Sequence, residues 1–332
     1  MIAFDRRQFL LAGGGAAALT GCGNAADRPF YAADVHPQDY PTVQAVRHMG
    51  EIIREQTGGR LSLRIYSGGQ LGSERDTLEI TIFGGIDINR VNLTPLNSIA
   101  KETLVPGMPF AFRSIAHMRA ACDGPPGQKI LDALRAHDLV GLCFYDSGAR
   151  SVYNTGRPVR TPDDMAGLKI RVQSSELFVA MIEALGANAT PMNYGEVYQA
   201  LLQGVIDGAE NNWPSFQTSR HYEAASYYTR TEHVMAPEVL VMGMRTWRKL
   251  SDTDQELVMD AAKQSVPIMR KLWDARVKRS KDIILESGVQ LIELEDKSAF
   301  REKMTPVYER FLDASLQNLF QDIQDITEPT RV

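Results

Sequence analysis

The 332-residue sequence predicts an α/β protein of two domains with a long helix that contacts both. In residues 30–93, segments with an apolar residue at every second position alternate with segments whose apolar residues recur at helical spacing. Their order is strand, helix, strand, helix, strand, which is typical of a parallel sheet covered by helices. The chain is longer than one average domain, so two domains are expected. Residues 251–286 keep a helical pattern that would extend roughly 50 Å, long enough to brace two domains.

Residues 1–21 are predicted to be an export signal and not part of the fold. The letters DRRQFL at residues 5–10 resemble a twin-arginine signal, and the apolar run after them is too short to span a bilayer as a permanent helix. The letters LTGC at residues 19–22 resemble a bacterial lipobox, in which Cys22 carries a lipid; in an ordinary signal peptide this cysteine would be incidental. Both alternatives predict a periplasmic protein whose residues 22–28 form a linker. Only the lipobox alternative adds a contact with the membrane, through a lipid anchor on Cys22.

Residues 29–147 are assigned mainly to the first domain. Pro41 suits the first turn of a helix, where no N–H is needed, and the glycines at 58–59 end that helix. Ser73 is expected to cap the next helix. The predicted elements are a strand at 30–33, a helix from 41, a strand at 61–65, a helix from 74, a strand at 86–93, helical residues 115–137 interrupted at 124–127, and a strand at 139–145.

Residues 148–237 are assigned mainly to the second domain, and residues 238–332 to segments that span both. The letters LKIRV at residues 168–172 alternate apolar and basic, which predicts a strand with Arg171 on the face opposite its apolar residues. The other predicted elements are a capped helix start at 161–164, helices ending at 186 and at 204, a short apolar run at 205–206, a strand at 238–244, the helix at 251–286, a strand at 289–294 and a closing helix at 300–319.

Composition excludes several classes of protein. With 44% hydrophobic and 23% charged residues the chain is ordinary for a soluble protein, and a net charge of −5 without a basic block argues against a nucleic-acid partner. Cys122 and Cys143 would pair in an oxidising compartment or serve as small buried apolar residues, the interpretation we favour. The six histidines show no ligand spacing, so the sequence predicts no metal site and no cofactor.

The chain carries no motif of a common enzyme class. It has no G-x-S-x-G nucleophile elbow, no H-E-x-x-H zinc motif and no phosphate-binding P-loop, and its Gly-rich tract lies inside the predicted signal. Catalysis therefore has no positive support in the sequence. A binding module is the better prediction, with an exported lyase or hydrolase of an acidic sugar as the alternative.

Several ordered motifs then resemble one known family. The letters GLKIRV at 167–172, EVYQAL at 196–201 and VIDGAEN at 205–211 are similar to the extracytoplasmic solute-binding subunit, of the DctP type, of tripartite ATP-independent periplasmic (TRAP) transporters. The resemblance covers about residues 30–322. It implies two α/β domains that close over a ligand like a venus flytrap, a helix that bridges both, and membrane permease subunits as partners.

The resemblance also implies site residues. Arg171 matches the carboxylate-binding arginine of the family, and Arg150 matches its second arginine, expected here on the loop after a strand. Asn211 matches a ligand-facing amide. Glu74 and Asn92 fall where the sialic-acid binders of the family place polar ligand contacts. A guanidinium at Arg171 fits this role, because its rigid donor fork grips a carboxylate with two hydrogen bonds.

Further ligand contacts are expected from other loops and strands. His36 and Asp39 lie in the loop after the first strand, and Trp213 follows the last family motif, although a lone histidine or tryptophan is more often a packing residue. Glu238 would add a hydrogen-bond acceptor from the hinge side. Glu210, next to the predicted amide, would serve as a structural partner that orients an arginine.

These residue types predict the class of ligand. Two arginines suit one carboxylate, whereas the acceptors at Glu74 and Glu238 suit hydroxyl groups and would repel a second carboxylate. The letters HPQDYP at 36–41 and NNWPSF at 211–216 are similar to family members that bind hexuronates. We therefore expect glucuronate or galacturonate as the ligand. The alternatives within the family are a C4-dicarboxylate and a 2-oxo or 2-hydroxy acid.

Overall fold

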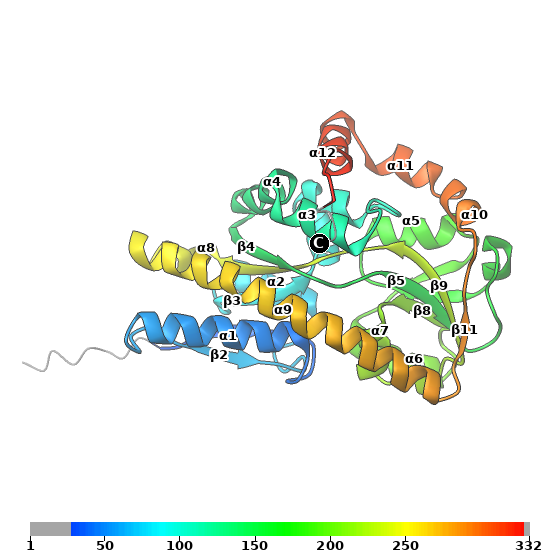
Figure 1. Ribbon diagram of the computed structural model, residues 1–332, viewed down its shortest axis with the longest axis horizontal. Coiled ribbons are helices and arrows are strands. Elements are labelled where there is room, and N and C mark those ends of the chain that lie inside the picture. Colours follow the sequence, from blue (N-terminus) through cyan, green and yellow to red (C-terminus); the bar gives the residue numbers. More distant parts are fainter. Residues whose placement is uncertain (1–27, 329–332) are drawn as a thin grey trace, which may run out of the picture.

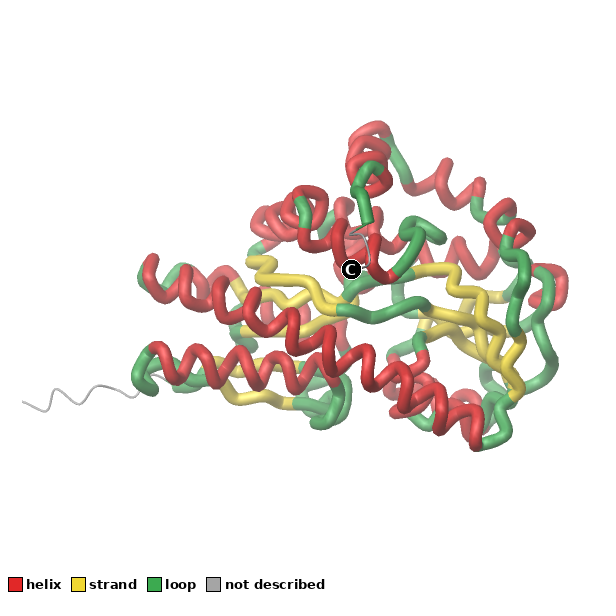
Figure 2. The backbone as a smooth tube through the Cα atoms, in the orientation of Figure 1, coloured by secondary structure: helices red, strands yellow, loops and turns green. Residues whose placement is uncertain are grey.

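A computed structural model describes residues 28–328, and the predicted signal with Cys22 lies outside these residues. The chain forms two α/β lobes, each built on one sheet (Figures 1 and 2). The first lobe contains a five-stranded sheet of order β2-β1-β3-β10-β4, and the second lobe contains a six-stranded sheet of order β11-β9-β5-β8-β6-β7. The predicted two-domain α/β architecture is confirmed.

The first sheet begins with the predicted alternation of strands and helices. Its parallel part pairs β1 with β2 and with β3. β10 then inserts between β3 and β4 and runs antiparallel to both, and each of its residues is buried, as expected for a central strand. The bounds are β1 (Phe30–Ala33), α1 (Pro41–Gln56), β2 (Leu63–Tyr66), α2 (Glu74–Ile82), β3 (Ile88–Asn92), β4 (Leu139–Tyr145), β10 (Glu238–Gly243) and α8 (Met244–Trp247).

Along the chain, two α-helices follow β3 and precede β4, and the break between them falls where the sequence predicts it. α3 (Ile115–Asp123) ends at Gly124 and α4 (Pro125–Ala133) begins directly after it. The backbones approach closely here, since a Cβ on Gly127 would lie 2.0 Å from the Cys122 carbonyl oxygen. Cys122 and Cys143 are both buried and unpaired, in agreement with their interpretation as small apolar residues.

The second sheet contains strands that the sequence analysis missed. Predicted strand β6 is present, whereas β5, β7 and β9 were not predicted, and the apolar run at 205–206 precedes β8 instead of forming it. β5 and β9 mix charged and hydroxyl residues with apolar ones, so neither shows the apolar alternation from which a strand is predicted. The bounds are β5 (Arg150–Asn154), β6 (Lys169–Val172), α5 (Glu176–Ala184), β7 (Asn188–Pro191), α6 (Val197–Leu202), β8 (Gly208–Asn211), α7 (Trp213–Thr218), β9 (Tyr227–Val234) and β11 (Gln290–Ile292).

The long helix α9 (Asp252–Glu286) is confirmed and contacts both lobes. Its first turn is capped by Ser251, whose hydroxyl accepts from the Asp254 N–H at 3.2 Å. It packs against α1 and β4 of the first lobe and against α7 of the second (Figure 1). No helix among residues 28–328 is both long enough and apolar enough to cross a membrane.

The predicted single closing helix is wrong. Three short helices replace it: α10 (Ser298–Glu302), α11 (Thr305–Phe311) and α12 (Ala314–Gln324). Pro306 occupies the start of α11, where a continuous helix would need its N–H, and Asp313 caps α12 by accepting from the Leu316 N–H at 2.9 Å. This segment packs α11 on α5 of the second lobe and α12 on α4 of the first, so it joins the lobes a second time.

Candidate ligand-binding site

A cavity of about 490 Å³ lies between the lobes. Glu74 on α2 lines it from the first lobe, and Arg171 on β6 and Tyr194 line it from the second. This volume is within the range of sites for small organic molecules. Direct hydrogen bonds join the lobes around it, from the Thr94 hydroxyl to Gln173 Oε1 at 3.0 Å and from the Ser175 hydroxyl to Asn97 Oδ1 at 2.8 Å.

Arg171 is a buried cation without a carboxylate partner among the described residues. Its side chain sits on β6, the residue is 2% exposed, and its Nε and Nη2 donate to the Met192 carbonyl oxygen at 2.9 and 2.7 Å. Burial lowers the pKa of Arg171, because removing the cation from water is only partly offset by the charge of Glu210. A buried unpaired guanidinium favours an anionic ligand at this end of the cavity.

Arg150, the second predicted arginine, is already paired within the protein. Its Nε and Nη2 donate to the two carboxylate oxygens of Glu210 at 2.6 and 2.7 Å, so Glu210 is the partner that orients it. Burial alone would lower the pKa of Arg150, but the charge and hydrogen bonds of Glu210 outweigh burial and raise it. The residue opens strand β5 and does not lie on the predicted loop, because β5 pairs with β8, which carries Glu210.

Asn211 lies beside this pair with its amide nitrogen still available. It is 4% exposed, and its Oδ1 accepts from Arg150 Nη1 at 3.0 Å and from the Asn212 N–H at 2.9 Å. Within residues 28–328 the side-chain N–H groups make no hydrogen bond. The amide is therefore oriented as a donor by the Arg150–Glu210 pair.

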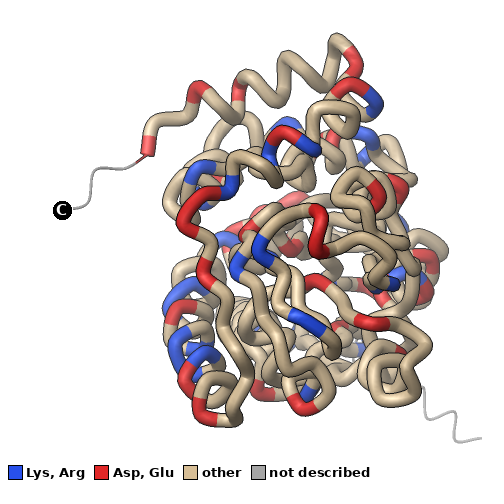
Figure 3. Tube along the Cα trace, turned by 90° about the vertical axis from the view of Figure 1, so that its right-hand side faces the viewer, with Lys and Arg blue, Asp and Glu red and all other residues tan. Residues whose placement is uncertain are grey.

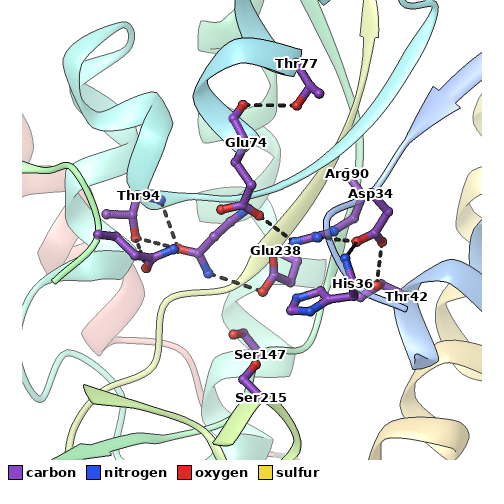
Figure 4. A network of polar contacts seen from close by, with 12 residues as sticks. Asp34, His36, Thr42, Glu74, Thr77, Arg90, Thr94, Ser147, Ser215 and Glu238 are labelled. Carbon is purple, nitrogen blue, oxygen red and sulfur yellow. Dashed lines mark hydrogen bonds and ion pairs between the residues drawn. The ribbon is translucent and has the colours of Figure 1, made fainter. Parts of the chain in front are cut away.

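The first-lobe side of the site centres on Arg90, which the sequence analysis missed. Arg90 lies on β3 with a fully buried side chain, and its Nη1 donates to Glu74 Oε1 at 2.7 Å and to Glu238 Oε2 at 2.6 Å (Figure 4). Its Nη2 contacts the carboxylate of Asp34. An arginine in the middle of a strand predicted to be covered by helices was the available signal, since a buried charge has to be paired.

Both polar atoms of the Asn92 side chain form hydrogen bonds within the protein. Its Nδ2 donates to the Ala236 carbonyl oxygen at 3.0 Å and to Glu238 Oε1 at 3.3 Å, and its Oδ1 accepts from the Thr94 N–H at 3.1 Å. Its backbone N–H donates to Glu74 Oε1 at 3.0 Å. Asn92 thus positions the two predicted acceptors Glu74 and Glu238.

The imidazole of His36 has no hydrogen-bond partner within residues 28–328. The residue is 5% exposed, and its ring stacks on Tyr40 at 3.8 Å between centroids. Burial holds the pKa of His36 well below its ordinary value, and the charges of Arg90 and Arg150 lower it further. Figure 4 shows the ring near Glu238, above Ser147 and Ser215. A neutral imidazole here offers one donor and one acceptor.

Of the predicted ligand contacts, Arg171 and Glu74 line the cavity itself, whereas His36, Asn92, Arg150, Asn211 and Glu238 do not. Asp39 and Trp213 lie apart from both groups. Asp39 is on the surface with a 70% exposed side chain, and it pairs with Arg276 Nη2 of α9 at 2.7 Å. Trp213 begins α7 and stacks on Tyr228 at 4.0 Å, inside the apolar core of the second lobe. Neither position could be distinguished from a ligand contact by spacing along the chain.

The chain matches the family model of bacterial extracellular solute-binding proteins, family 7, over residues 32–314. A solute-binding protein of Chromohalobacter salexigens is 43% identical over 294 residues, which cover 88% of this chain and 88% of that protein.

Solved structures of similar proteins extend over both lobes. A TRAP periplasmic solute-binding protein from Bradyrhizobium sp. BTAi1, in complex with α/β-D-galacturonate, is 52% identical with a TM-score of 0.89, covering 90% of this chain and 100% of that one. A TRAP periplasmic solute-binding protein from Chromohalobacter salexigens with bound D-glucuronate is 42% identical with a TM-score of 0.87 and covers the same shares, 90% and 100%.

Proposed function

Because this chain belongs to family 7 of the bacterial extracellular solute-binding proteins, we propose that it captures a hexuronate, glucuronate or galacturonate, between its lobes. It is a binding protein and not an enzyme, and it acts outside the cytoplasm. Delivery of the ligand to the membrane permease of a TRAP transporter completes the proposal, supported by the relatives described as TRAP proteins.

One observation carries the choice of ligand. Arg171 is the buried cation without an ionised partner in residues 28–328 that lines the cavity, and Glu74 lines the same cavity from the opposite lobe. The site thus has a cationic wall for one carboxylate and an acidic wall for hydroxyl donors. A sugar acid with one carboxylate carries both complements, whereas succinate, which has two carboxylates, and pyruvate have no hydroxyl group.

We also propose the domain boundaries and the way in which the exported chain is attached to the membrane. Residues 29–147 and 148–237 would be mainly the first and second domains, with 238–332 spanning both; the return of β10 to the first sheet and of β11 to the second supports this division. After removal of the proposed export signal at 1–21, a lipid on Cys22 would tether the protein at the membrane where the permease lies. The mixture of basic and acidic positions along the chain (Figure 3) is in keeping with a small-molecule ligand.

Calorimetric titration of the exported chain tests the ligand. Glucuronate and galacturonate are titrated beside succinate, pyruvate and glucose. We expect binding of a uronate, and Arg171→Ala should weaken it by about 30-fold or more, because truncating one partner of a buried charge pair costs about 2 kcal/mol at least. Lys169→Ala is the matched control, since Lys169 is an exposed cation two residues away on the same strand.

The outcomes separate the candidates. Binding of succinate or pyruvate in place of the uronates would keep the family and overturn the ligand. An equal loss of affinity in Arg171→Ala and Lys169→Ala would overturn the role of Arg171. Recovery of chemically altered uronate after incubation would revive the enzyme alternative.

A further inference from the structure

Three carboxylates surround the single guanidinium of Arg90. Asp34, Glu74 and Glu238 all contact its two terminal nitrogens, and its buried Nε has no hydrogen-bond partner in the described part of the chain. Both terminal nitrogens are occupied and the side chain has no exposed surface, so Arg90 cannot itself bind the carboxylate of a ligand. The formal charge of this four-residue cluster is negative, which makes the first-lobe wall acidic in spite of its arginine.

The hydrogen bonds of the cluster leave one carboxylate oxygen for the cavity. Asp34 accepts at both oxygens, from Arg90 and the His36 N–H on one and from the Thr42 hydroxyl at 2.7 Å on the other. Glu238 likewise accepts at both, from Arg90 and from Asn92. Glu74 accepts only at Oε1, from Arg90 and from the Asn92 N–H, so within residues 28–328 its Oε2 has no donor.

The start of a capped helix sets the position of Glu74 at the cavity. Glu74 is the first residue of α2, which begins with a capping box between Ser73 and Asp76. Its side chain is 12% exposed and lines the cavity that Arg171 lines from the other lobe. An anionic acceptor and a buried cation therefore face one ligand from opposite sides.

We infer that Arg90 is a positioning residue that holds Glu74 Oε2 toward the ligand, and that this acidic wall selects a hydroxyl and rejects a second carboxylate there. This inference rests on the proposed function and names how the site separates sugar acids with one carboxylate from those with two. A hydroxyl donates to Oε2, whereas a carboxylate brings a like charge against the cluster with no cation left to pair with it.

Galactonate and galactarate form a matched pair of probes. Both are acyclic six-carbon acids, and they differ at one end, where galactonate has a hydroxymethyl group and galactarate a second carboxylate. The wild-type protein should bind galactonate about 100-fold more tightly than galactarate, because like charges held close in a buried site repel strongly. Galacturonate is titrated beside them as the reference ligand.

Glu74→Gln tests the acidic wall directly. Its amide oxygen has to face the donors Arg90 and Asn92, so its NH₂ takes the place of Oε2 and becomes a donor that suits a carboxylate. The preference for galactonate should fall by about tenfold or more. Glu51→Gln is the control: Glu51 is an exposed carboxylate on α1 that does not line the cavity, and its substitution should leave the preference unchanged.

Arg90→Lys tests the positioning role through a double-mutant cycle. Lysine keeps the charge but loses the fork that holds Glu74, so adding Glu74→Gln to Arg90→Lys should change the ligand preference much less than it does in the wild-type protein. An arginine that only stabilised the fold would leave the effect of Glu74→Gln intact. Thermal unfolding monitors whether Arg90→Lys folds, and Glu74→Gln alone keeps the inference testable if it does not.

The outcomes distinguish this inference from the function on which it rests. If galacturonate binds, any of three results would overturn the inference alone. These are equal affinities for galactonate and galactarate, no binding of galactonate, or an unchanged preference for galactonate in Glu74→Gln. An absence of binding for every sugar acid would overturn the proposed function itself.

Discussion

At the scale of single residues, the site contrasts one paired and one unpaired arginine. Arg150 has a bidentate carboxylate partner in Glu210, whereas Arg171 donates only to a backbone carbonyl oxygen among the described residues. Arg150 also donates from Nη1 to Asn211 Oδ1 at 3.0 Å, so the pair holds the orientation of that amide. The sequence singles out both arginines but cannot tell them apart, since the difference depends on which side chains meet across β5 and β8.

The Arg150–Glu210 pair should be important for stability. Glu210→Gln removes the charge that compensates a buried guanidinium, so we expect the free energy of unfolding to fall by about 3–5 kcal/mol in urea titrations. The exposed pair of Arg220 and Glu223 is the control, because solvent screens it and Glu223→Gln should change stability little. Equal effects of the two substitutions would show that burial of the first pair has no energetic consequence.

Single positions also show the limit of sequence reasoning. Local motifs singled out Arg171 and Glu74, which both line the cavity. Arg90 could not be found in this way, because its partners Asp34, Glu74 and Glu238 come from three separate parts of the chain and meet only after β10 has inserted beside β3. Contacts between residues so far apart in the chain cannot be inferred from their spacing.

At the scale of elements, the chain passes from β4 to β5 through a short crossing that packs on α9. Gly148 in this crossing has a φ of +61°, and a Cβ on it would lie 3.2 Å from Cζ2 of Trp273. The crossing therefore needs glycine for its backbone conformation and for its contact with the bridging helix.

Gly148→Ala should lower stability by about 1–2 kcal/mol, from backbone strain plus the displaced indole. Gly186→Ala is the control, because Gly186 has a φ of +86° with nothing within 4 Å and so reports the backbone strain alone. Urea titrations of both variants should give the larger loss for Gly148→Ala. An equal loss would mean that Trp273 moves aside without cost.

The elements themselves were predicted unevenly, for physical reasons. Helices with strong caps and strands with a pure apolar pattern, such as α2 and β4, follow from local residues. β9 was missed because its buried threonines and buried histidine interrupt the apolar pattern; the Thr229 hydroxyl, for example, is buried against the Val159 carbonyl oxygen, which it meets only in the folded protein. The closing segment was predicted as one helix because its apolar period continues through Pro306, whereas the proline restarts the helix there.

At the scale of the whole molecule, buried histidines should make the protein sensitive to acid. Burial lowers the pKa of His221 to about 3 and that of His233 to about 4. A histidine with a lowered pKa stays neutral in the folded protein but takes up a proton on unfolding, so stability is lost as pH falls below about 6.5.

Each of these histidines should cost about 2 kcal/mol of stability at pH 5 relative to pH 7 or above. Urea titrations at both pH values measure this loss, and His221→Gln should reduce it by about that amount. His48→Gln, at a position 39% exposed on α1, should leave the pH dependence as it is. A pH dependence that survives in His221→Gln and in His233→Gln would assign the acid sensitivity to other groups.

The place of β10 in the first sheet has a consequence for synthesis on the ribosome. Its residues, Glu238–Gly243, form the strand between β3 and β4, although those two strands precede it by about a hundred residues or more. The nascent amino-terminal lobe therefore has to wait, with a missing central strand, until the whole second lobe up to β9 has been made. The carboxylate of Glu238 arrives with that late strand, so the ligand site cannot form before the lobes are joined.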